Sequence, residues 1–131
     1  MKTFDAFLKP KRKENLKFIL SDAFVGEDDK PVQWEMRQLS VTEGLEISKN
    51  APADYTELMA VYVSNALVVP NLKDKDLLSA LSEREGRTIL KPLDALKCIV
   101  NDAELARLIS LYIQHNDLNA NFAEKVEEAK N

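Results

Sequence analysis

The chain has 131 residues, of which 45% are hydrophobic and 31% charged, and this fits one folded domain and excludes a disordered or collagen-like chain. Its single cysteine, Cys98, excludes an internal disulfide framework, and its single histidine, His115, excludes multi-histidine metal sites. The formal charge of -4 is uneven, since residues 1–20 carry six basic and two acidic residues and the other 111 carry 12 basic and 20 acidic ones. Such an acidic body is a poor ligand for nucleic acid.

The first residues, MKTFDAFLKPKRK, contain no apolar segment of the kind that a secretion signal needs. No apolar run elsewhere approaches the ~20 residues of a membrane-spanning helix. We therefore expect a cytoplasmic protein that makes no membrane contact.

Residues 1–14 are predicted to form a basic, flexible N-terminal arm ahead of a single α+β domain over residues 15–131. Residues 9–13 read KPKRK, and the apolar side chains of the arm are Phe4, Phe7 and Leu8. These three side chains fit one short helical turn, but a helix of this length is marginal on its own. The arm is therefore either frayed or ordered against a partner.

A period of two predicts a β-hairpin over residues 15–38. The alternating apolar side chains are Leu16, Phe18 and Leu20 in the first strand and Val32, Trp34 and Met36 in the second. Between the strands, residues 25–31 read VGEDDKP, which favours a turn and places Pro31 at the entry to the second strand. Because a lone hairpin is barely stable in water, its apolar face needs other elements to cover it.

From residue 40 onward the apolar residues recur at three- and four-residue spacing, which predicts helices over residues 40–131. Capping signals mark their starts: Ser40 with Glu43, Asp54 with Glu57, and Asn101 with Glu104. Gly86 ends a helix over residues 74–85, and Pro92 opens the next one.

The apolar stripe behind Asp54 runs as far as Val69, which predicts one helix that ends at Pro70. A last, narrow stripe with Phe122 and Val126 lies near the C-terminus. Nothing in the sequence separates a second domain. The predicted fold class is therefore α+β, an N-terminal β-hairpin packed on a mostly helical bundle.

We predict no catalytic, cofactor-binding or metal-binding residues. His115 falls at the end of the helix predicted over residues 101–116, where a cation interacts well with the terminal carbonyls. Cys98 lies in an apolar segment and fits a small buried thiol better than a reactive nucleophile. The acidic residues 27–29 lack the alternation and the bidentate glutamate of a calcium loop. These observations favour an interaction protein over an enzyme.

The basic run over residues 9–13 leaves a second interpretation open. It would suit a small regulatory or adaptor protein whose N-terminal arm binds nucleic acid or an acidic partner. However, no aromatic residues are interleaved with the basic ones, as base stacking would require. We therefore expect no nucleic-acid partner.

Five sequence patterns, in order along the chain, resemble the XkdN-like phage tail assembly chaperones. They are the N-terminal set that runs from FL at residues 7–8 to KPVQWEMR at residues 30–37, VPNLKDKDLL at residues 69–78, Gly86 with Leu90 and Lys91, AEL at residues 103–105, and FAEKVEEAKN at residues 122–131. Two positions depart from the family pattern. Asp29 stands where the family usually has glycine, which affects the turn, and Ala23 stands where it often has arginine.

The resemblance implies a hairpin followed by helices, and a chaperone without catalytic groups or cofactors. The implied partner is the tape measure protein, a long, apolar, helical chain that the chaperone keeps soluble until the tail tube forms. The tail tube protein and self-association stay open as further contacts. The implied location is the cytoplasm of the bacterial host and not the mature virion.

The partner-binding candidates are the apolar side chains near the two ends of the chain: Phe4, Phe7, Leu8, Phe122 and Val126. A narrow apolar stripe at a terminus can fold onto an apolar partner helix. The alternative is that both ends dock on the core of their own chain.

Overall fold

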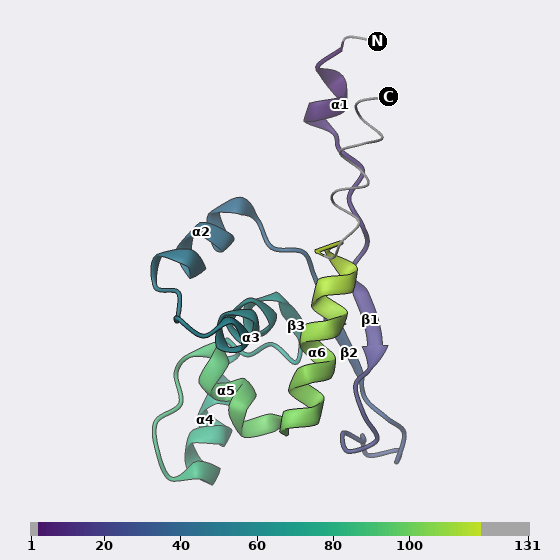
Figure 1. Ribbon diagram of the computed structural model, residues 1–131. Coiled ribbons are helices and arrows are strands. Elements are labelled where there is room, and N and C mark those ends of the chain that lie inside the picture. Colours follow the sequence, from purple (N-terminus) through teal and green to yellow (C-terminus); the bar gives the residue numbers. More distant parts are fainter. Residues whose placement is uncertain (1–2, 119–131) are drawn as a thin grey trace.

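A β-hairpin followed by helices is the order of elements in the computed structural model, which describes residues 3–118 (Figure 1). The strands are β1 (Leu16–Ile19), β2 (Gln33–Met36) and β3 (Leu67–Val69). The helices are α1 (Asp5–Leu8), α2 (Val41–Lys49), α3 (Tyr55–Ala66), α4 (Lys75–Glu85), α5 (Pro92–Ile99) and α6 (Asp102–His115). The predicted α+β fold class is confirmed.

The hairpin is the predicted one, but it belongs to a larger sheet. β1 and β2 are antiparallel, with Phe18 opposite Trp34, and β2 pairs on its other edge with β3. The sequence prediction was wrong at this third strand, because it continued the preceding helix to Val69, whereas α3 ends at Ala66. The backbone of β3 pairs with β2, and this non-local pairing outweighs the local helical pattern.

The hairpin turn closes on a residue in the left-handed region. Asp29 has φ of 62°, and its backbone N–H donates to the Gly26 carbonyl over 3.0 Å. The Gly26 N–H donates in turn to the Lys30 carbonyl, also over 3.0 Å. Aspartate tolerates this conformation better than most residues do. The tight turn therefore forms even though Asp29 stands at a position that favours glycine.

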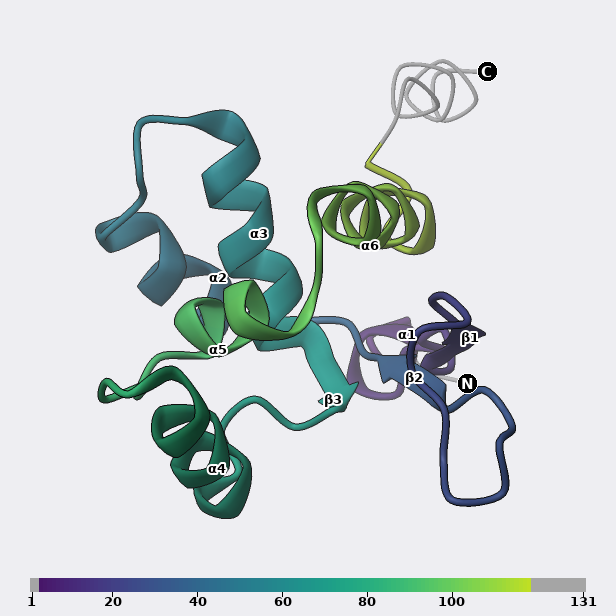
Figure 2. The ribbon, with the colours of Figure 1, turned by 90° about the horizontal axis from the view of Figure 1, so that it is seen from below.

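One face of the sheet contributes to the core, with Trp34 and Met36 both buried. α3 packs against α5 and α6, and α4 packs against α5 (Figure 2). The buried core side chains are Leu20, Trp34, Met36, Met59, Val63, Ala66, Leu67, Leu72, Leu81, Ile89, Ala95, Leu96, Leu108 and Tyr112. The prediction of Trp34 as a core anchor is confirmed.

Local capping chemistry sets the helix ends largely as predicted. The two reciprocal capping boxes, Ser40 with Glu43 and Asn101 with Glu104, are both present. At α3 the Asp54 side chain accepts from the Glu57 N–H, but the Glu57 side chain does not accept in return from the Asp54 N–H. The other predicted signals are confirmed: α4 ends at Gly86 with φ of 69°, and Pro92 begins α5.

Polar contacts join α6 to the start of the chain. The Ser21 hydroxyl donates to Glu104 Oε2 over 2.6 Å, and Arg107 donates to the Leu20 carbonyl. At the other end of α6, Lys13 Nζ donates to the His115 carbonyl over 3.0 Å and lies 2.7 Å from Asp117 Oδ2. Both ends of α6 are thus tied to the N-terminal fifth of the chain. None of the described helices is long and apolar enough to cross a membrane.

Candidate partner-binding surface

An apolar groove lies between the turn end of the hairpin, β3, α4 and α5. Its volume is about 450 Å³. Its lining residues are Ala23, Phe24, Val25, Val32, Trp34, Val69, Pro70, Leu77, Leu81, Arg84 and Ile99. Ten of these eleven side chains carry no charge, so the groove suits the apolar face of another protein.

Aromatic stacking builds the floor of the groove. The Phe24 and Trp34 rings meet edge to face with their centroids 5.1 Å apart, and Phe18 lies 6.5 Å from Trp34 in a tilted arrangement. The Val32 N–H donates to the Phe24 carbonyl over 2.8 Å, which extends the strand pairing towards the turn. Trp34 is thus fixed in the core, and backbone pairing between Val32 and Phe24 fixes the edge of the groove.

Three valines on the rim are exposed to solvent. Val25 is 51% exposed, Val32 39% and Val69 38%. They come from the two arms of the hairpin and from β3, so only the folded sheet brings them together. Clustered apolar side chains that stay in water mark an interaction surface more often than isolated ones do.

Arg84 fixes the helical wall of the groove and is the one charged residue in its lining. Its Nη2 donates to the Cys98 carbonyl over 2.6 Å, and its Nε lies 3.2 Å from Glu85 Oε2. The guanidinium therefore satisfies a carbonyl near the C-terminal end of α5, where a cation is favourable. This contact joins α4 to α5, and the carboxylate of Glu85 balances the charge of Arg84.

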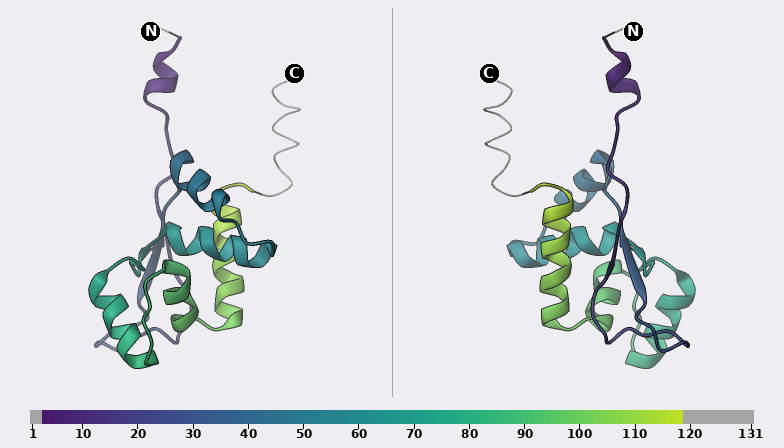
Figure 3. Two further views of the ribbon diagram at one scale, coloured as in Figure 1. Left: turned by 90° about the vertical axis from the view of Figure 1, so that its left-hand side faces the viewer. Right: turned by 90° about the vertical axis from the view of Figure 1, so that its right-hand side faces the viewer.

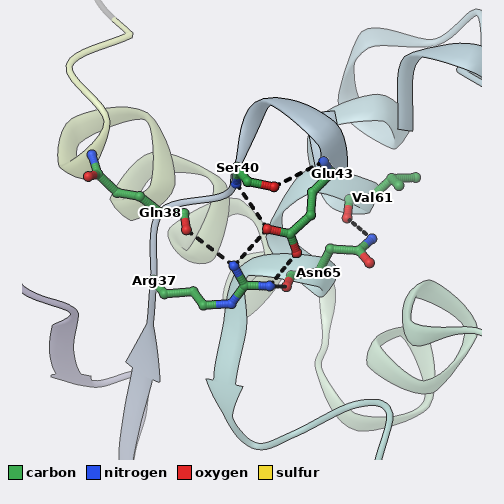
Figure 4. Close-up of polar contacts among 6 residues, drawn as sticks. All are labelled: Arg37, Gln38, Ser40, Glu43, Val61 and Asn65. Atoms are coloured by element: carbon green, nitrogen blue, oxygen red, sulfur yellow. Dashed lines mark hydrogen bonds and ion pairs between the residues drawn. The ribbon is translucent and has the colours of Figure 1, made fainter. Parts of the chain in front are cut away.

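A second cleft, of about 700 Å³, is polar and lies beside the N-terminus of α2. The Arg37 guanidinium donates two hydrogen bonds to the Glu43 carboxylate, of 2.9 Å and 2.5 Å (Figure 4). It also donates to the Gln38 and Asn65 carbonyls. The bond from Arg37, aided by the Ser40 backbone, lowers the pKa of Glu43 to about 2, and the same contact raises the pKa of Arg37. These charges neutralise each other, so the network fastens α2 to the body and presents no reactive group.

Within the described part of the chain, the predicted partner-binding residues do not line the apolar groove. Phe7 and Leu8 lie on the short helix α1 and Phe4 is its N-cap residue, and all three are exposed. Phe122 and Val126 lie outside the described residues. Sequence reasoning missed the groove because its walls come from four separate segments. The available signal was the pair Val25 and Val32, two apolar residues on either side of an acidic turn.

His115 and Cys98 have the expected positions but not the expected surroundings. His115 is the last residue of α6, as predicted, and burial and the nearby Lys13 lower its pKa. A second cation, Lys13, also lies at this helix end and donates to the His115 carbonyl. Cys98 is half-buried and not fully buried, because it lies near the end of α5 with Arg87 Nη2 3.8 Å from its sulfur.

Metal-binding chemistry finds no support in the part of the chain that the structure describes. No three histidine, cysteine or acidic side chains within residues 3–118 are grouped so that they could hold a metal ion. His115 Nε2 is buried, and no hydrogen-bond partner is recorded for it among these residues.

Comparisons with known proteins agree with this description. A family model described as the phage XkdN-like tail assembly chaperone protein matches residues 4–130. The crystal structure of the protein YqbN superposes with a TM-score of 0.70 at 17% sequence identity, over 91% of this chain and 98% of that one. At this identity the likeness concerns the fold. No curated protein matches the sequence.

Proposed function

The chain belongs to the XkdN-like phage tail assembly chaperones, and on that premise we propose that it binds the tape measure protein and keeps it soluble until the tail tube forms. The family is one of chaperones and not a known enzyme family. A tape measure protein is long, helical and apolar, so its uncovered faces would aggregate before the tube assembles around it.

The observation that carries this proposal is the apolar groove with its three exposed valines. An amphipathic helix presents apolar side chains at three- and four-residue spacing, and such a row fits a groove whose floor is aromatic and whose rim is aliphatic. The groove is held by β-pairing and by the contact from Arg84 to α5, so it is formed before the partner arrives.

The charge of the body supports the same function. Residues 21–131 carry 12 basic and 20 acidic residues, so copies bound along one tape measure protein repel the copies on another. Tube subunits would then displace the chaperone, which places it in the host cytoplasm and not in the virion. Phe4, Phe7, Leu8, Phe122 and Val126 stay proposed contacts to protein partners in this scheme.

Co-expression with the tape measure protein of the same phage tests the proposal. We expect the wild-type chain to move that protein from the pellet to the soluble fraction. Val32→Asp and Val25→Asp should weaken binding roughly tenfold or more, because a charge in the centre of an apolar contact must be desolvated. Leu90→Asp is the matched control, since Leu90 is 73% exposed and lies outside the groove.

Two outcomes would contradict the proposal. One is a tape measure protein that stays insoluble beside the wild-type chain. The other is groove variants that keep their thermal stability and still solubilise as well as Leu90→Asp. A salt-sensitive mobility shift with DNA or RNA that depends on Lys9, Lys11 and Arg12 would favour the regulatory alternative instead.

A further inference from the structure

The charge around the apolar groove is strongly one-sided. Residues 22–31, at the turn end of the hairpin, and residues 74–87, which contain α4, together hold eight acidic and four basic residues. The whole chain holds 22 acidic and 18 basic residues, so the other 107 residues hold 14 of each. The entire formal charge of -4 therefore belongs to the two segments that wall the groove.

We propose that the groove takes an amphipathic helix whose apolar side chains are bordered by lysine or arginine. This inference rests on the proposed function and deepens it, because it names the charge of the partner helix that the same groove receives. An apolar groove alone accepts any amphipathic helix. Charged groups at its rim, however, attract one sign of charge and repel the other.

On the hairpin side, the acidic groups lie in the turn between two of the rim valines. Glu27, Asp28 and Asp29 are all exposed there. None of the three forms an ion pair within the described part of the chain. Lys30 is the one basic residue in the sequence of this turn, so the turn presents a net negative charge beside the groove.

On the helical side, Asp76 and Glu83 each stand next to a lining residue of α4 in the chain, and both are exposed. Neither forms an ion pair within residues 3–118. Because they are seven residues apart, they lie on one side of the helix, about 10.5 Å apart along its axis. A partner helix beside α4 meets both of them with basic residues at the same seven-residue spacing.

The basic side chains of the helical wall are bound within their own chain. Arg84 donates to the Cys98 carbonyl and pairs with Glu85. The Nη2 atom of Arg87 lies 3.8 Å from the Cys98 sulfur. Both guanidinium groups therefore reach towards α5, and they do not balance the carboxylates of Asp76 and Glu83.

The two acidic walls face the groove from different sides, because the hairpin turn and α4 lie on opposite sides of β3 (Figure 2). A helix in the groove thus has acidic groups along both of its flanks. Lysine or arginine on either side of the apolar stripe satisfies both walls at once. An acidic helix with the same apolar stripe is repelled by both.

Two synthetic amphipathic peptides test the inference on the purified full chain. Both carry leucine at three- and four-residue spacing, and the flanking positions are lysine in one and glutamate in the other. Fluorescence anisotropy should show the lysine peptide binding about tenfold more tightly or better at low ionic strength, because each exposed charge pair changes an affinity by up to about fivefold and several pairs change sign together. Added salt should reduce this ratio.

Variants with reversed charges locate the preference. Glu27→Lys combined with Glu83→Lys should cut the ratio to about threefold or less, because it reverses one acidic group on each side of the groove. Glu14→Lys combined with Glu46→Lys is the matched control, since it changes the net charge equally at exposed residues outside both acidic segments. This control should keep the ratio within about twofold of the wild type. Circular dichroism should show both variants folded, because all four side chains are on exposed residues.

Equal binding of the two peptides, tighter binding of the glutamate peptide, or no binding of either would overturn the inference. So would a preference that survives Glu27→Lys with Glu83→Lys. If both peptides bound equally and Val32→Asp weakened both, only the charge assigned to the partner would be wrong, and the groove would stay the binding site. The proposed function has its own test, since the co-expression experiment uses the tape measure protein and no peptide.

Discussion

Replacing Glu104 by alanine should destabilise the fold by about 3 kcal/mol. This carboxylate is buried, with 7% of its surface exposed. One oxygen accepts from the Asn101 N–H over 2.9 Å, and the other accepts from the Ser21 hydroxyl over 2.6 Å. Losing one side of a capping box costs about 1 kcal/mol, and losing a charge-assisted hydrogen bond about 2 kcal/mol. The hydrogen bond from Ser21 also holds the hairpin to α6, so the loss should appear in global unfolding.

Urea unfolding and thermal melts measure this loss. For a chain of this size, 3 kcal/mol lowers Tm by about 10 °C. Glu83→Ala is the control, because Glu83 is exposed on α4, and its change should stay within about 0.5 kcal/mol. In a double-mutant cycle, Ser21→Ala and Glu104→Ala should show a coupling of about 1 kcal/mol.

The pH dependence gives a second check. The Ser21 and Asn101 bonds lower the pKa of Glu104, so its contribution to stability is complete above the ordinary value of 4.5 and is lost as the pH falls below that value. The wild-type and Glu104→Ala stabilities should therefore converge in acid. A Glu104→Ala variant as stable as Glu83→Ala at neutral pH would refute the reasoning.

Three further changes have expected outcomes. Asp29→Gly should raise the free energy of unfolding by about 0.5 kcal/mol, measured in urea, because glycine adopts a φ of 62° without strain. His115→Gln should abolish a loss of stability that the wild type shows as the pH falls below about 6.5, since burial and Lys13 keep the folded histidine neutral. Glu43→Gln should cost about 1 kcal/mol at neutral pH, limited by solvent exposure, and melts should show this difference shrinking as the pH falls from 4.5 to about 2.

The features that the sequence predicted correctly are those decided by neighbouring residues. The capping boxes at Ser40 and Asn101 and the left-handed end at Gly86 depend on chemistry within four residues, and each is in place. The hairpin was predictable for a similar reason, because alternation and a turn sequence lie within residues 15–38. Such patterns carry enough information when the partner of a residue is close in the chain.

The errors share the opposite property. β3 was assigned to a helix because Val69 continues a helical spacing, and only its pairing with Glu35 of β2 makes it a strand. The contact of Lys13 with the His115 carbonyl was not predicted either, because the two residues are 102 positions apart in the chain. The groove was missed for the same reason, since its rim valines come from two distant segments. Contacts over such separations leave no periodic signal in a single sequence.

The apolar groove and the helices α1 and α2 occupy opposite parts of the molecule. A partner contact at the groove should therefore be independent of a contact at α1. The hairpin turn and α4 lie at one end of the body in Figure 1, and α1 and α2 lie towards the other. Val32→Asp and Phe7→Asp should therefore weaken binding of the tape measure protein independently, with losses of binding free energy that add in the double variant to within about 0.5 kcal/mol, because distant residues without a shared contact act additively. The affinities of the two single variants and the double variant for the tape measure protein measure this. A coupling of more than about 1 kcal/mol would mean that the arm and the groove form one surface, and the separation argued from the fold would be wrong.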